Sequence, residues 1–113
     1  MDCLFCKIAS GTIPTTLIYQ DDLVVAFDDI NSQAAVHKII IPRKHIPTLN
    51  DLKPEDLNLM GHMVQSASML AKQYHIEQEG YRLVMNCNDN GGQSIFHLHL
   101  HLLGGRRMQW PPG

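Results

Sequence analysis

The sequence predicts a small α+β domain, with a five-stranded, mainly antiparallel sheet and one long helix inserted between two of its strands. Five strand-like runs follow one another along the chain, and a single long helical pattern separates the third run from the fourth. The chain has 113 residues, which is enough for one real core and too few for two. We therefore expect residues 1–113 to form a single domain.

Before the long helix, the sequence predicts a short helix and three strands, at residues 3–9, 17–20, 23–27 and 35–41. The first segment is apolar and is followed by Gly11, which is typical of a short helical turn. The next two segments are β-branched and aromatic runs separated by two aspartates, which indicates a hairpin. The third strand contains three consecutive isoleucines and stops at Pro42.

The long helix is expected to begin at Pro54, because proline suits the first helical position and two acidic residues follow it. Apolar residues then recur at spacings of three and four and form one stripe: Leu57, Met60, Val64, Ala67, Ala71 and Tyr74, widened by Met63 and Leu70. Gly80 ends the helical region, and residues 81–87 predict a fourth strand. The stripe should cover one face of the sheet, which leaves the other face for function.

The fifth strand is expected at residues 96–103, where His97, His99 and His101 alternate with leucines. Side chains of a strand point alternately to its two faces, so the three imidazoles should share one face. A core has no need of such a row, and imidazole is the side chain whose charge changes near neutral pH. The alternative is a solvated strand face that happens to use histidine. We interpret the row as a functional site.

Residues 88–92, which include two glycines, are followed at once by Gln93 and Ser94. Glycines let a backbone approach a ligand closely, and successive amides can form an anion nest, so this loop is expected to bind a phosphate. A plain hairpin turn is the alternative. Asp29 ends another strand; it is either a solvated loop residue or an acceptor for ribose hydroxyls. The apolar slot for a base would consist of Phe5, Ile8, Phe27 and Ile30.

Composition narrows the class of protein. Hydrophobic residues make up 44% of the chain and its formal charge is −2, so neither the amount nor the placement of basic residues suggests a nucleic-acid partner. The first residues lack the features of a signal peptide, and no stretch approaches the ~20 apolar residues of a membrane span. The three cysteines cannot all pair with one another, which argues against a disulfide framework. We expect a cytoplasmic protein without a membrane partner.

Residues 97–103 match the alternating signature of the histidine triad (HIT) superfamily, and residues 91–94 precede it at the expected spacing. The C-terminal segment, residues 103–113, resembles that of the Hint branch, the histidine triad nucleotide-binding proteins. The resemblance implies a HIT fold that pairs into a ten-stranded homodimer. It also implies that the apolar tail around Trp110 lies across the dimer interface, near the partner's site.

For activity, the resemblance implies a purine nucleoside phosphoramidase that needs no cofactor for catalysis. His99 would be the nucleophile and would carry a nucleotidyl intermediate. The remaining roles follow by the same positional match: phosphate contacts by His101, Ser94, Asn86, Gly92 and Gln93, a ribose contact by Asp29, a purine contact by Ile30, and a supporting role in proton transfer by His37. Alternatives are a nucleotide-binding regulatory module with little turnover, a metalloenzyme with a three-histidine zinc site, and a dinucleoside polyphosphate hydrolase.

One feature departs from the Hint branch, since Cys3 and Cys6 form a Cys-x-x-Cys pair that many of its members lack. Several bacterial HIT proteins have this pair and bind zinc, and their other two ligands correspond to His45 and His97. Two thiolates and two imidazoles suit tetrahedral zinc. The alternatives are two half-buried cysteines without a metal, and a redox pair, for which the thioredoxin-like context is missing. We predict a structural zinc site.

Overall fold

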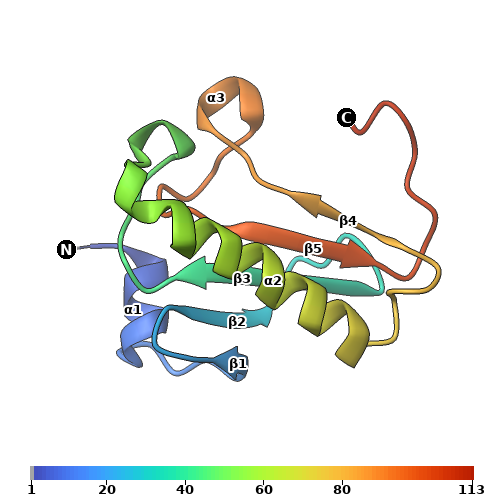
Figure 1. The fold of residues 1–113 in the computed structure, drawn as a ribbon, viewed down its shortest axis with the longest axis horizontal. Helices are drawn as coiled ribbons and strands as arrows, with labels where there is room; N and C mark the ends of the chain where they lie inside the picture. The colour runs from blue at the N-terminus through green and yellow to red at the C-terminus, as the bar shows by residue number, and fades with distance from the viewer. Residues whose placement is uncertain (1) are drawn as a thin grey trace.

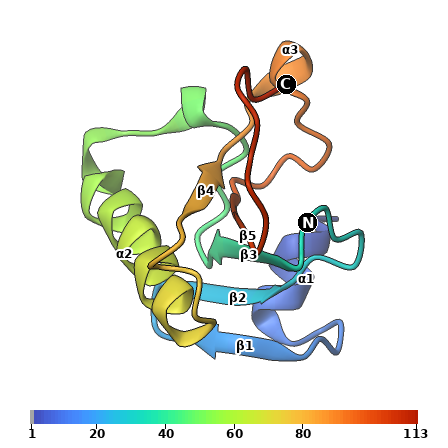
Figure 2. The same cartoon turned by 90° about the vertical axis from the view of Figure 1, so that its right-hand side faces the viewer.

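The computed structural model describes residues 2–113 and confirms a five-stranded antiparallel sheet with helices on both faces (Figures 1 and 2). The strands run in the order β1-β2-β3-β5-β4, and every neighbouring pair is antiparallel. The elements are α1 (Leu4–Ser10), β1 (Leu17–Gln20), β2 (Val24–Asp28), β3 (Val36–Pro42), η1 (Leu49–Asp51), η2 (Pro54–Asp56), α2 (Leu57–Gln73), β4 (Tyr81–Val84), α3 (Asn88–Gly91) and β5 (Leu100–Gly104).

The strands divide their apolar side chains between two faces, as the twofold period of a strand requires. One face packs against α2 and includes Val24, Ala26, Ile40, Leu98, Leu100 and Leu102. The opposite face includes Val25, Phe27, Ile39 and Ile41 and packs against Phe5 and Ile8 of α1. Figure 2 shows α1 and α2 on opposite sides of the sheet. The leucines of the histidine run therefore lie on the α2 side, and their neighbouring histidines face α1.

The predicted apolar stripe of α2 is only partly correct. The buried residues are Leu59, Met63, Ser66, Ala67, Leu70 and Ala71, whereas Leu57 and Val64 are 75% and 49% exposed. Two overlapping apolar stripes satisfy the same helical spacing, and packing on β3 and β5 selects the one centred on Met63. Neither α2 nor another helix within residues 2–113 has both the length and the apolar character that crossing a bilayer requires.

The strand prediction for residues 96–103 is wrong at its start, because the paired strand β5 begins only at Leu100. The chain bends at residues 95–97, and the Leu98 N–H donates to the Ile46 carbonyl at 2.7 Å. β4 is likewise shorter than predicted and ends at Val84. The loop expected at residues 88–92 contains one helical turn, α3. His97 and His99 thus precede the paired strand while keeping the predicted alternation.

Candidate active site and metal-binding cluster

The hydrogen bonds of His99 determine which of its ring nitrogens carries the proton. His99 Nδ1 lies 2.8 Å from the backbone carbonyl oxygen of His97. A carbonyl only accepts, so Nδ1 must be the donor and the neutral ring keeps a lone pair on Nε2. The His99 side chain is buried, with its ring against Phe5 at a centroid separation of 5.1 Å. Its orientation is therefore fixed, and the nitrogen with the lone pair is Nε2.

His37 determines the protonation of His101 in the same way. The Gln33 backbone N–H donates to His37 Nδ1 at 3.0 Å, so neutral His37 carries its own proton on Nε2. That Nε2 lies 2.9 Å from His101 Nδ1 and 3.3 Å from Asp29 Oδ2. Because His37 Nε2–H donates to it, His101 Nδ1 is an acceptor and its proton is on Nε2. The neighbouring rings of His99 and His101 therefore have opposite tautomers, with centroids 5.0 Å apart.

Burial keeps the His37 and His101 side chains neutral. It lowers the pKa of His101 to about 4, and the nearby His99 and His37 rings act in the same direction, while Asp29 opposes them. Burial also lowers the pKa of His37, against the raising effect of Asp29. Asp29 Oδ2 lies 4.0 Å from His101 Nδ1, so one carboxylate oxygen is near both rings. At neutral pH both imidazoles of this cluster are therefore neutral.

The glycine loop directs most of its hydrogen bonds inward. The Gly92 and Gln93 amides donate to carbonyls of α3, at 3.0 Å each, and not towards the histidine face. The Gln93 side chain is buried and bonds Pro47, Ile95 and Asn88, so it holds the loop in place. Asn86 donates to the Gly91 carbonyl at 2.6 Å, and Ser94 is exposed. Phosphate contacts by Ser94, Asn86, Gly92 and Gln93 remain predictions.

The four residues expected to form the base slot do not lie together at the surface. Phe5, Ile8 and Phe27 are all less than a tenth exposed and form part of the core beneath α1. Ile30 follows β2 and is fully exposed. The purine contact of Ile30 also remains a prediction.

A second cluster joins Cys3, Cys6, His45 and His97, the four residues that the resemblance implies as zinc ligands. The two Nδ1 atoms are 3.1 Å apart, and the separations from sulfur to Nδ1 are 3.3 Å for Cys3–His97, 3.3 Å for Cys6–His45 and 3.5 Å for Cys6–His97. Tetrahedral zinc with ordinary bond lengths would separate such atoms by about 3.3 to 3.6 Å. The donor set and its spacing therefore fit a zinc ion.

The surroundings of His97 strengthen this fit. Its ring is fully buried, and Nε2 donates to the Pro42 carbonyl at 2.8 Å, which leaves a lone pair on the Nδ1 that faces the cluster. In the absence of a cation, burial raises the pKa of the Cys6 thiol, and neighbouring Cys3 raises it further. A metal ion would reverse this effect, because its charge stabilises thiolates.

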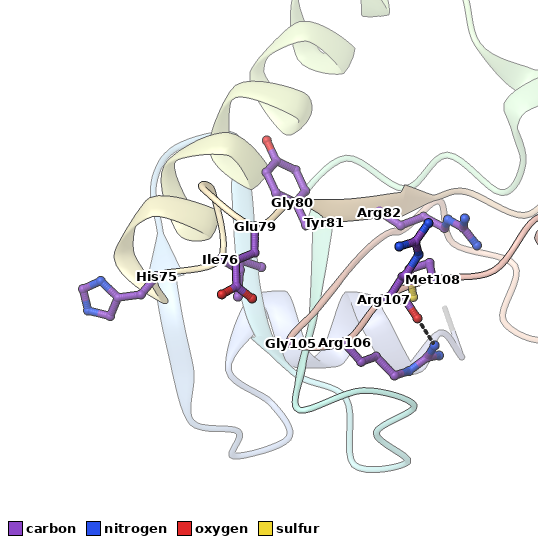
Figure 3. A pocket seen from close by; sticks show the side chains of 10 residues that line it. All are labelled: His75, Ile76, Glu79, Gly80, Tyr81, Arg82, Gly105, Arg106, Arg107 and Met108. Atoms are coloured by element: carbon purple, nitrogen blue, oxygen red, sulfur yellow. Dashed lines mark hydrogen bonds between the residues drawn. The ribbon is translucent and has the colours of Figure 1, made fainter.

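A hollow of about 620 Å³ lies away from the histidine face, between the α2–β4 connection and the C-terminal segment (Figure 3). The triad histidines are not among its lining residues, which are His75, Ile76, Glu79, Gly80, Tyr81, Arg82, Gly105, Arg106, Arg107 and Met108. Arg106 also donates to the Gln33 carbonyl at 3.3 Å, and Gln33 in turn donates to His37. The sequence indicates no role for Gln33, because its contact with His37 is made by the backbone N–H and not by the side chain.

The fold and the triad together define a histidine triad protein, and comparison with known proteins agrees. A family model described as "Scavenger mRNA decapping enzyme C-term binding" matches residues 2–110. The chain belongs to the histidine triad family, as the sequence predicted. It is 49% identical over 105 residues to the purine nucleoside phosphoramidase of Escherichia coli (strain K12), covering 93% of this chain and 88% of that protein.

Solved structures of histidine triad proteins have the same fold as this chain. A HIT family hydrolase from Legionella pneumophila Philadelphia 1 superposes with a TM-score of 0.97 at 51% identity, covering 99% of this chain and all of that one. A histidine triad protein from Clostridium difficile has a TM-score of 0.93 at 40% identity, covering 96% and 95% of the two chains. The HIT fold is thereby confirmed.

Proposed function

We propose that the protein hydrolyses purine nucleoside phosphoramidates, with P–N bonds of the AMP-lysine type, through a nucleotidyl intermediate on His99. The observation that carries the proposal is the pair of opposite tautomers: His99 has a lone pair on Nε2, whereas neighbouring His101 has a proton there. One nitrogen suits attack on phosphorus, and the other suits donation to a phosphoryl oxygen. The name of the Escherichia coli relative supports the substrate class.

The reaction proceeds in two displacements. His99 Nε2 bonds to the α-phosphorus, the P–N bond breaks, and the leaving amine takes up a proton. The positive charge that develops on the ring is stabilised through Nδ1–H by the His97 carbonyl. Water then attacks the phosphorus and loses a proton, the P–Nε2 bond breaks with its electron pair returning to Nε2, and the nucleoside monophosphate leaves neutral His99. His101 donates to the phosphoryl oxygens, and His37 transfers protons behind it.

The nucleotide would lie across residues from three elements. Ser94, with the loop residues Asn86, Gly92 and Gln93, would surround the phosphate. Asp29 would accept the ribose hydroxyls, which its partly exposed carboxylate can reach without breaking its bond from the Asn31 amide. Ile30, fully exposed beside it, would cover one face of the purine.

Amine release from an adenosine 5′-phosphoramidate tests the proposal. We expect turnover by the native protein that His99→Ala abolishes while AMP binding remains, because the lost group forms a bond only during reaction. Binding without turnover in the native protein would indicate a nucleotide-binding module instead. Faster turnover of dinucleoside polyphosphates than of phosphoramidates would indicate a dinucleoside polyphosphate hydrolase. Immediate loss of activity with a chelator, before any change in structure, would indicate a metalloenzyme.

We further propose that Cys3, Cys6, His45 and His97 bind one structural zinc ion, on the strength of the donor set and spacing described above. Such an ion would link α1 to the segment before β5 and so contribute to the free energy of unfolding. Metal analysis of the purified protein should find one zinc per chain, and a chelator should lower the melting temperature. Thiolate ligands require a reducing compartment, so we propose a cytoplasmic location.

We also propose a homodimer in which two sheets join through β4. This strand is at the edge of the sheet, and Leu57 and Val64 form an exposed apolar line on α2. A second copy that covers both features would extend the sheet to ten strands. Light scattering after size exclusion should report a dimer that Val64→Glu dissociates. Leu23→Glu, at another exposed leucine between β1 and β2, is the matched control.

A further inference from the structure

The residue that bears the proposed nucleophile lies outside the hydrogen-bonded ladder of the sheet. β5 pairs with β3 from Leu100 onward and with β4 from His101 onward, so His99 precedes both ladders. The preceding backbone is attached through the Leu98 N–H, which donates to the Ile46 carbonyl. The position of His99 therefore depends on local anchors more than on strand pairing.

The strongest of these anchors is His97, which is held from two directions. Its ring lies between the Pro42 carbonyl, at 2.8 Å from Nε2, and the cluster of Cys3, Cys6 and His45 around Nδ1. Its backbone carbonyl accepts the His99 Nδ1 proton. The ring and this carbonyl belong to one residue, so the contacts that hold the ring also restrict how far the His97 backbone can shift.

Phe5 supplies a second connection between the same cluster and the nucleophile. It lies between the two cysteines in the sequence, and its ring meets His97 and His99 edge-on, with centroids 6.0 and 5.1 Å away. Cys3 is also the N-cap of α1, where its sulfur accepts the Cys6 amide proton. The position of the Phe5 ring, which contacts His99, therefore depends on the helical turn between the two cysteines.

We propose that Cys3, Cys6 and His45 are positioning residues for the nucleophile. When they hold a divalent cation of the zinc type together with His97, they fix the His97 carbonyl and thereby the His99 tautomer that leaves Nε2 able to attack. This inference rests on the proposed function. The cluster acts on the chemical step more than on nucleotide binding, because Asp29 and Ile30 lie on the β2–β3 connection and not on this segment.

The test compares the double variant Cys3→Ser/Cys6→Ser with Cys87→Ser, which changes the third cysteine, outside the cluster. Zinc content, kcat, KM and the imidazole ¹⁵N shifts of His99 are measured for both and for the native protein. We expect the double variant to lose zinc and to lose kcat by about 10- to 100-fold, with KM nearly unchanged. Its His99 shifts should indicate a mixture of tautomers. Cys87→Ser should match the native protein throughout.

If the double variant does not fold, a second pair of variants tests whether the cluster positions His99. His45→Cys keeps a zinc ligand, since the longer bond from zinc to sulfur compensates for the shorter side chain, whereas His45→Ala removes the ligand. We expect His45→Cys to retain zinc, kcat and a single His99 tautomer, and His45→Ala to lose all three. The chelated native protein, measured while its circular dichroism is unchanged, should behave as His45→Ala does.

Zinc-free protein with native kcat and a single His99 tautomer would overturn the proposal. Failure of the proposed function is a separate result, recognised by native, zinc-loaded protein that binds AMP without releasing amine. In that event the ¹⁵N shifts still decide whether the cluster positions His99. Equal losses in kcat and affinity for AMP would also overturn the proposal, because they would indicate general disruption of the site.

Discussion

Acidification should destabilise the protein through His101. Burial lowers its pKa to about 4 in the folded state, against an ordinary value of about 6.5 in the unfolded chain. Between these values the unfolded chain binds more protons than the folded one, so stability rises with pH across the window and falls on acidification. Neutral His37, whose pKa burial also lowers, contributes in the same direction.

The size of the effect follows from the two pKa values. Between pH 7 and pH 5, a single group titrating at about 4 when folded and 6.5 when unfolded costs about 1.8 kcal/mol. Because 18% of the side chain is exposed, solvent screens part of this, and we expect about 1.5 kcal/mol. For a small domain this corresponds to a shift of about 1 M in the midpoint of urea unfolding.

The assay is urea unfolding at pH 7 and pH 5 for the native protein and for His101→Asn, which retains an acceptor for the His37 N–H. The variant should lose less stability on acidification than the native protein, by about 1.5 kcal/mol. His75→Asn is the control, since His75 has a φ of 61° that asparagine tolerates, and it should retain the native pH dependence. Parallel curves for the native protein and His101→Asn would refute the reasoning.

Two further substitutions test packing, one at the end of β5 and one in the glycine loop. Gly104→Ala should cost about 1–3 kcal/mol, because its Cβ would lie 2.5 Å from Cδ1 of buried Ile76, and Ile76→Val should relieve part of that cost in thermal melts. Gln93→Glu should cost about 2 kcal/mol in urea unfolding, because it replaces the amide that donates to Pro47 and Ile95 with a carboxylate; an unchanged midpoint would contradict this.

The order and type of the elements could be predicted from the sequence, because each has a local cause. Pro54 marks the start of the helical region, where a 3₁₀ turn leads into α2, and the isoleucines of β3 are buried on both faces as their continuous run implies. The buried face of α2 could not be predicted. Val64 and Met63 fit a helical stripe equally well, and only contact with the sheet distinguishes them.

At the site, side chains could be predicted and backbone partners could not. The alternation of the triad predicts three rings on one face, whereas the place of the two cysteines beside His97 follows only from the resemblance to zinc-binding bacterial HIT proteins. The same pattern does not locate the start of β5. His97 and His99 keep the alternation of a strand, although β5 pairs with β3 only from Leu100 onward. Nor does any sequence pattern indicate that Gln33 donates its backbone N–H to His37.

Hydrogen-bond partners explain how three identical side chains present different ring nitrogens as donor and acceptor. A neutral imidazole has one donor and one acceptor, so the partner of either nitrogen determines the state of the other. The Pro42 carbonyl accepts the Nε2–H of His97 and leaves a lone pair on Nδ1, whereas the His97 carbonyl accepts the Nδ1–H of His99 and leaves a lone pair on Nε2. His37 donates to Nδ1 of His101 and so makes Nε2 a donor. The chemistry of the triad thus resides in the groups around it, and a substitution that preserves every histidine but moves one of these partners should still change the reaction.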